Sequence, residues 1–211
     1  MLHAGVDTGG RAGRASSLGR LALREGVAPA AFVAAILLSS YAMAGLPNVK
    51  LFDLLVFVAG YTLGFRRGAT VAVAAWLVYG QANPWGATHA QLLLTLMAAE
   101  TVYAVAGALA HRWLKPEDVR LRPSAGMVVL AVAALATTVL YDVAANVYTG
   151  YYWGAIAGAG EYARWIGIAV FGPGALFFMV LHVGSNLALF PVFGPPLIKA
   201  TERAKARLGW E

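Results

Sequence analysis

The segment FFMVLHVGSNLALF (residues 177–190) is apolar except for one histidine, one serine and one asparagine. Similar apolar runs recur along the chain, and short groups of charged residues separate them. Of the 211 residues, 60% are hydrophobic and only 12% are charged. A bilayer-spanning helix uses about 20 apolar residues, so this length accommodates about six. The sequence therefore predicts an all-α integral membrane protein with six transmembrane helices in a single bundle.

The apolar runs place the helices and divide the chain into three parts. We expect helices at residues 27–46, 51–64, 68–82, 90–114, 124–148 and 171–196. The last should stop at FGPP because Pro195 and Pro196 lack an amide proton. The second and third should be joined by a tight FRRG turn. Residues 26–198 then form the membrane domain, between a flexible basic tail (1–25) and a second basic tail (199–211).

The distribution of positive charge predicts the orientation in the membrane. All Lys and Arg residues except Lys50 and Arg164 lie in the tails, in FRRG or in the loop after the fourth helix. These segments lie on one side of a six-helix arrangement. Because cytoplasmic loops carry the excess of Lys and Arg, both termini are expected in the cytoplasm. We expect a multi-pass protein of a prokaryotic plasma membrane.

Several kinds of chemistry find no support in the sequence. The chain has no cysteine, which excludes disulfides and thiolate sites. The four histidines are scattered, so no metal or other cofactor is expected. The net charge of +6 reflects Lys and Arg at helix ends, so we expect lipid contacts and no nucleic-acid partner. A GxxxxGK[ST] phosphate loop is missing from the sequence, and no catalytic motif is complete.

Polar residues within the apolar runs are the candidates for function. A charged side chain near the bilayer centre costs about 2.5–3.5 kcal/mol on insertion scales, so it is kept where it has a partner, water or a ligand. Glu100 lies in the fourth helix. Asp142 and Asn146, and likewise His182 and Asn186, lie four residues apart on one helical face. These groups could line one outward-facing cavity, or pair with each other and hold the helices together.

Two other sets of residues carry weaker signals. The outer segments contain Asn83 and many aromatic residues, which a membrane-interface belt also explains. Trp153 is the best candidate for stacking on a ligand, because it follows the Asp142 face closely. Small residues on the first helix permit close helix approach, for docking or for packing within the bundle. They are Ala30, Ala31, Ala34 and Ala35.

Three motifs in order resemble the substrate-binding S components of energy-coupling factor (ECF) transporters. They are LPNVKLFDLLVFVAGYTLGFRRGATVAVAAWLVYGQANPWG (residues 46–86), YDVAANVYTG (141–150) and HVGSN (182–186). The resemblance covers residues 27–199. Its most specific part is the succession of an LPNVK loop, a short helix, a basic GFRRG turn, a third helix and NPWG.

The resemblance implies a protein that captures a vitamin or related micronutrient from outside and passes it to an ATP-driven module. In that family, an AxxxA motif on helix one contacts the transmembrane coupling subunit, which works with two ATPases. The Ala30/Ala34 and Ala31/Ala35 pairs match this motif. The family holds its ligand in the outer halves of helices four to six, beneath the loop between helices one and two. The implied ligand residues are Glu100, Asp142, Asn146, His182 and Asn186, with Asn48 beneath or within the lid.

Other functions remain open at this point. An intramembrane protease would use Phe178, His182 and Asn186 as fragments of FxxxH and HxxxN patterns, but Glu100 is not followed by the second glutamate of the EExxxR motif. A stand-alone carrier would be favoured by inverted repeats, and we see none in the sequence. A purely structural membrane protein is a further alternative. The acidic residues Glu100 and Asp142 favour a neutral or cationic ligand. Lys50 or Arg164, in the predicted outer loops, would reverse this preference by contacting the ligand.

Overall fold

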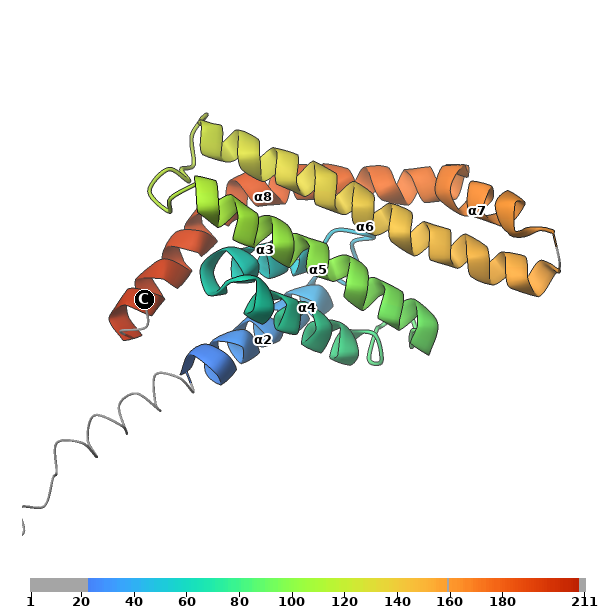
Figure 1. Ribbon diagram of the computed structural model, residues 1–211, viewed down its shortest axis with the longest axis horizontal. Coiled ribbons are helices and arrows are strands. Elements are labelled where there is room, and N and C mark those ends of the chain that lie inside the picture. The colour runs from blue at the N-terminus through green and yellow to red at the C-terminus, as the bar shows by residue number, and fades with distance from the viewer. Residues whose placement is uncertain (1–22, 159, 209–211) are drawn as a thin grey trace, which may run out of the picture.

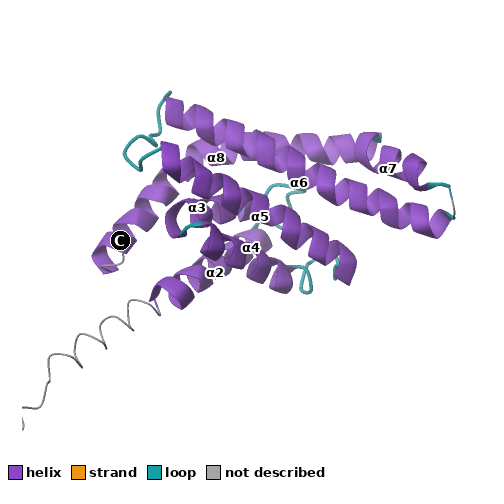
Figure 2. Cartoon of the chain, in the orientation of Figure 1, coloured by secondary structure: helices purple, strands orange, loops and turns teal. Residues whose placement is uncertain are grey.

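The computed structural model describes residues 23–158 and 160–208. Within these ranges all regular secondary structure is helical (Figure 2), which confirms the predicted all-α class. The helices are η1 (Leu23–Val27), α2 (Ala28–Ala42), α3 (Phe52–Leu63), α4 (Phe65–Tyr79), α5 (Ala90–Trp113), α6 (Ala125–Ala157), α7 (Tyr162–Phe171) and α8 (Pro173–Leu208).

In the described part of the chain, four helical segments are long and apolar enough to cross a membrane, which indicates a membrane protein. They are Glu25–Ala42, Ala90–Trp113, Ala125–Ala157 and Pro173–Leu208. The helices α3 and α4 have 12 and 15 residues, fewer than a typical span. Six spans and cytoplasmic termini therefore stay predictions.

The short helix α3 lies at the centre of the bundle. Every one of its residues is buried, and it packs against α2, α4, α5 and α8 (Figure 1). Small residues bring it against α5: a Cβ on Gly60 would meet the Ala104 carbonyl oxygen, and one on Gly107 would meet the Phe57 carbonyl oxygen. Glycines at such crossings let helix backbones touch. This explains why α3 is apolar on all sides.

The FRRG segment is not a turn, contrary to the prediction. The helix α4 starts at Phe65, so both arginines belong to its first turn. The chain instead reverses at Gly64, whose φ of 87° favours glycine. Arg67 is then held on the helix, where its guanidinium donates to the Leu63 carbonyl at 2.9 Å and pairs with Glu25.

The fifth predicted helix is longer than expected. It was predicted to end at residue 148, yet α6 continues to Ala157 through the aromatic segment. The glycines that indicated a loop are packing positions: a Cβ on Gly150 would meet the backbone of Ile166, and one on Gly154 would meet Tyr162. The helix α7 therefore lies directly against the end of α6, as Figure 1 shows.

The last helix does not stop at FGPP, so this prediction was wrong. The helix α8 continues through Pro191, Pro195 and Pro196 to Leu208, and the chain bends in this region (Figure 1). Each proline removes one amide donor, but membrane helices accept such breaks where neighbouring groups satisfy the freed carbonyls. Residues 199–208 of the predicted C-terminal tail are thus helical, and residues 209–211 lie outside the described range.

The predicted N-terminal tail falls mostly outside the described range. Residues 1–22 are not described, and the described chain begins with η1. Glu25, at the end of the predicted tail, forms the ion pair with Arg67 of α4. The ordered bundle therefore includes the last part of the segment that was predicted as a tail.

Candidate functional site

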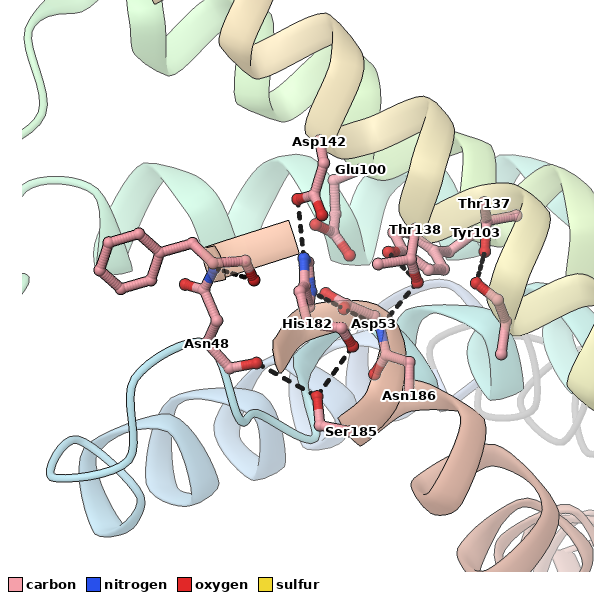
Figure 3. A network of polar contacts seen from close by, with 12 residues as sticks. Asn48, Asp53, Glu100, Tyr103, Thr137, Thr138, Asp142, His182, Ser185 and Asn186 are labelled. Carbon is pink, nitrogen blue, oxygen red and sulfur yellow. Dashed lines mark hydrogen bonds and ion pairs between the residues drawn. The ribbon is translucent and has the colours of Figure 1, made fainter. Parts of the chain in front are cut away.

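His182 of α8 lies between two carboxyl groups inside the bundle (Figure 3). Its Nδ1 is 2.8 Å from Asp142 Oδ1 of α6, and its Nε2 is 2.6 Å from Asp53 Oδ2 of α3. All three side chains are at most 10% exposed. Asp53 occupies the first turn of α3, where the positive end of the helix dipole favours a carboxylate.

The geometry of this triad determines its charge. Each of the two short contacts needs one proton between a ring nitrogen and a carboxyl oxygen. The triad therefore holds two shared protons, equivalent to two carboxylates around one imidazolium, which gives a net charge of −1. An isolated charge of this kind is unfavourable in an apolar interior, so compensation by neighbours or a ligand stabilises it.

Hydrogen bonds extend the triad across the bundle. The amide Nδ2 of Asn186 donates to Asp53 Oδ2 at 2.6 Å and to Thr138 Oγ1 at 2.8 Å. Thr138 Oγ1 also accepts from the Tyr103 hydroxyl at 3.0 Å. The polar network thereby links α3, α5, α6 and α8. His182 and Asn186 share a helical face, and that face contacts this network.

Glu100 adds a third buried carboxyl group beside the triad. It is 0% exposed, and its Oε2 accepts from Trp76 Nε1 at 3.1 Å. Figure 3 shows its carboxyl group directed toward Asp53 and His182. The indole N–H is neutral, so it does not balance a carboxylate at this position. Three carboxyl groups thus gather where α3, α5, α6 and α8 meet.

Some buried oxygens of the site lack a hydrogen-bond partner. Among the described residues, these atoms are Glu100 Oε1, Asp142 Oδ2 and Asn186 Oδ1, together with Ser40 Oγ of α2, which lies outside the network. A buried polar atom without a partner is normally satisfied by a water or a ligand. All four can accept a hydrogen bond; the serine hydroxyl also donates, and a carboxyl oxygen donates only when it is protonated. The polar cluster therefore has several unused acceptors, and the ammonium of Lys50, which contacts aromatic rings, is a donor close to them.

A cavity of about 180 Å³ opens beside the triad. Its walls combine polar, charged and aromatic side chains from the lid loop and from α3, α4, α6 and α8. They are Asn48, Lys50, Phe52, Asp53, Trp76, Tyr141, Asp142, Ala145, Asn146 and His182. We call this space the inner cavity.

The loop between α2 and α3 closes over the inner cavity. Asn48 adopts a left-handed backbone conformation with φ of 52°. Its Nδ2 donates to the Phe178 carbonyl at 3.1 Å, and its own carbonyl accepts from the Ser185 hydroxyl at 3.2 Å. Two contacts from one residue thus hold the loop on α8 (Figure 3). The resemblance to S components implied Asn48 beneath or within such a loop, and a ligand beneath the loop stays a prediction.

A second cavity, of about 360 Å³, lies under the same loop. It is lined by loop residues 43–50 with Ser40, Tyr79, Trp85 and Phe178, and we call it the outer cavity. Asn48 and Lys50 line both cavities. The two cavities therefore share these loop residues as part of their walls.

Lys50 places a positive charge at the boundary between the cavities. Its Nζ lies 5.1 Å from the ring centre of Tyr79 and 5.9 Å from that of Trp76, within the range of a cation–π contact. Burial lowers the pKa of Lys50 from its usual value of 10.5, whereas nearby carboxylates act in the opposite direction. The ammonium is thus held by aromatic rings and by long-range attraction to the acidic cluster.

The structure brings most predicted ligand residues together. Asn48, Asp142, Asn146 and His182 line the inner cavity, and Glu100 and Asn186 lie in the network behind it. Trp153 lies elsewhere: it is on the C-terminal part of α6, 50% exposed, and its ring is 6.4 Å from that of Trp165 on α7. Asn83 accepts from the Trp85 amide at 2.9 Å in the loop after α4.

Sequence reasoning missed Asp53, which contacts both His182 and Asn186. The available signal was its position: a lone carboxyl group in the run LFDLLVFVAGYTL, which is otherwise apolar on every face. A helix that is apolar all round is buried, so its single charged residue must face a partner. Thr138 and Tyr103 were also missed, because both types are common in apolar helices.

The predicted docking alanines lie on an exposed face of α2. Ala31 and Ala35 line an apolar groove of about 410 Å³ between α2 and the C-terminal part of α8. Leu197, Ala200 and Ala204 form the α8 wall. Ala30 and Ala34 are exposed beside the groove and do not line it.

Comparison of the chain with protein-family models, with curated proteins and with solved structures gave no match.

Proposed function

We propose that the chain is the substrate-capture S subunit of an ECF-type importer, which binds a vitamin-like micronutrient and passes it to an ATP-driven coupling module. The observation that carries this proposal is the inner cavity, where a loop clamped by Asn48 covers a buried polar cluster. A small cavity that combines apolar walls with a few convergent polar groups is typical of a small-molecule site.

The unpartnered oxygens support a ligand function over a purely structural one. A network that served only to hold helices together would be expected to satisfy its own members. Asp142 Oδ2 faces no partner among the described residues, although the other oxygen of that carboxyl group binds His182. Groups left in this state fit a site that is completed by a bound molecule.

The apolar groove supports the part of the proposal that concerns partners. Ala31 and Ala35 present small side chains on an exposed face, which permits close approach of another helix. In the proposed assembly, this face contacts the transmembrane coupling subunit. The two ATPases then act through that subunit, because no phosphate-binding loop occurs in this sequence.

Purification from the source membranes tests the proposal. The protein, extracted in mild detergent, should carry a small molecule and associate with a membrane subunit and ATPases. Mass spectrometry of the intact complex and of the extracted small molecules measures both. A bound small molecule without ATPase partners would favour a stand-alone carrier, and neither finding would leave a structural role.

Paired variants on α2 test the docking face. Replacing both Ala31 and Ala35 with leucine should weaken assembly with the coupling subunit and leave ligand binding unchanged, because the groove is distinct from the inner cavity. The matched variant with leucine at Ala30 and Ala34 determines which alanine pair forms the contact. Equal loss of ligand binding and assembly would mean that the alanines pack the bundle.

A further inference from the structure

We infer that the inner cavity takes a compact, planar organic cation whose N–H groups donate to Asp142 and the acidic cluster, in competition with the ammonium of Lys50. This inference rests on the proposed function and specifies the chemical class of its substrate. It is carried by three observations: the unused acceptors, the balance of charge and the aromatic walls.

The hydrogen-bonding groups of the site require donors. Asp142 lines the inner cavity with its side chain nine-tenths buried, and its Oδ2 has no partner among the described residues. Glu100 Oε1 and Asn186 Oδ1, in the network behind the cavity, also lack partners there. A carboxylate ligand would add more acceptors to such a site. A protonated amine, amidine or ring nitrogen supplies the missing donors and compensates charge.

The charges of the site also favour a cation. The triad of Asp53, His182 and Asp142 carries a net charge of −1, and the buried Glu100 adds a third carboxyl group beside it. Both ring nitrogens of His182 are already engaged by carboxyl oxygens, so the imidazole has no N–H left for an anionic ligand. Lys50 is the remaining cation at the cavity wall, and it is held over aromatic rings.

The walls determine the size and shape of the ligand. Phe52, Trp76 and Tyr141 present aromatic rings to the inner cavity, which suits a planar ring and a cation–π contact. The volume of about 180 Å³ is below the roughly 300 Å³ at which ligand pockets usually begin, so the bound group is compact. A longer ligand would extend past Asn48 into the outer cavity.

Lys50 occupies a position where its ammonium and a ligand cation share the same partners. Its ammonium lies near the ring of Trp76, and Trp76 also lines the inner cavity. A ligand cation in the cavity therefore meets the same ring and the same carboxylates as Lys50. Removing the lysine charge should strengthen binding of a cation, whereas it should abolish binding of an anion that uses Lys50 as its counter-ion.

Three probes of similar shape and different charge test this inference: benzamidinium, benzamide and benzoate. Binding to the purified full chain is measured by titration calorimetry in detergent. We expect benzamidinium to bind at least tenfold more tightly than benzoate, with neutral benzamide between them. Asp142→Asn should weaken benzamidinium binding at least tenfold, and Lys50→Met should strengthen it at least threefold. Arg164→Met, which removes an exposed cation of α7, is the matched control and should leave it unchanged.

The outcomes decide the inference whether or not every variant folds. Lys50→Met changes a loop residue, so it provides the test even if Asp142→Asn fails to give a folded protein. The inference is overturned if benzamidinium binds no more tightly than benzoate. It is also overturned if Lys50→Met binds benzamidinium more weakly than the unchanged protein does. An anionic molecule extracted from a complex with ATPases would overturn the cation class and leave the proposed importer function intact. The reverse result, cation binding without coupling partners, would overturn only the importer function.

Discussion

Replacing His182 with leucine should destabilise the protein even without ligand. The change replaces the imidazole with an apolar side chain of similar size. It removes both short contacts, at 2.8 Å to Asp142 and at 2.6 Å to Asp53. The two carboxyl groups then remain buried at the same junction of helices without the group that held them together. The loss should therefore exceed that of two neutral hydrogen bonds.

The magnitude follows from two reference values. Hydrogen bonds between membrane helices contribute about 0.6 kcal/mol on average and up to about 1.7, so two contacts give about 1–3 kcal/mol. Removing one partner of a buried ion pair costs about 3–5 kcal/mol in soluble proteins, because the remaining charge is uncompensated. We expect His182→Leu to lower the free energy of unfolding by about 3 kcal/mol. Changing Asp53 and Asp142 to asparagine as well should restore more than half of this loss.

Unfolding of the purified, ligand-free protein by sodium dodecyl sulfate in mixed micelles, followed by circular dichroism, measures these differences. Unchanged stability of His182→Leu would refute the triad as an energetic link between α3, α6 and α8. A triple variant as unstable as the single variant would refute uncompensated charge as the cause. The conservative His182→Gln, whose amide NH2 can still donate to one of the two carboxyl groups, should lie between the leucine variant and the unchanged protein.

Three further predictions concern packing, ionisation and orientation. Gly107→Ala should destabilise the protein by about 1–3 kcal/mol, because the added Cβ meets the backbone of α3. In the same assay, Gly184→Ala should stabilise α8 by about 0.5–1 kcal/mol, because nothing lies near the added Cβ. Burial lowers the pKa of Lys50, so the unfolded state binds more protons than the folded state. The free energy of unfolding should therefore rise as the pH increases toward 10.5. Lys50→Met, measured by thermal unfolding, should lack this rise. A reporter fused after Trp210, beyond the described residues, should be cytoplasmic, and one inserted near Gly158 should be external; finding both on one side would remove the six-span topology.

The sequence predicted the helical class and most of the polar cluster for one physical reason. Polar groups are rare in lipid-facing runs, so Glu100, Asp142, His182 and Asn186 stand out against their apolar neighbours. Spacing then placed the last two on one face. Which group would meet which partner was not predictable, because the pairing depends on how α3 is inserted among the longer helices. Asp53 entered the network through that insertion.

The errors at helix ends also have a common cause. Glycine and proline were interpreted as local breaks, but at several positions their role is set by a neighbouring helix. Gly150 and Gly154 bring α7 onto α6, and Pro195 is buried within the bundle. Gly64 is the opposite case, since its positive φ does end a helix two residues before the basic pair. Single-sequence patterns do not distinguish these situations, because they contain no information on which backbone approaches the glycine.

The helix α8 joins two distant parts of the protein through a flexible joint. His182 and Asn186 lie before Pro191, and the groove wall from Leu197 onward lies after Pro196. Between them three amide donors are missing, so bending in this segment disrupts fewer backbone hydrogen bonds than bending elsewhere along the helix. A change of angle between the half that carries His182 and the half that lines the groove is therefore taken up at the prolines. The buried carboxyl groups and the groove beside α2 thus lie along the two arms of one bent helix.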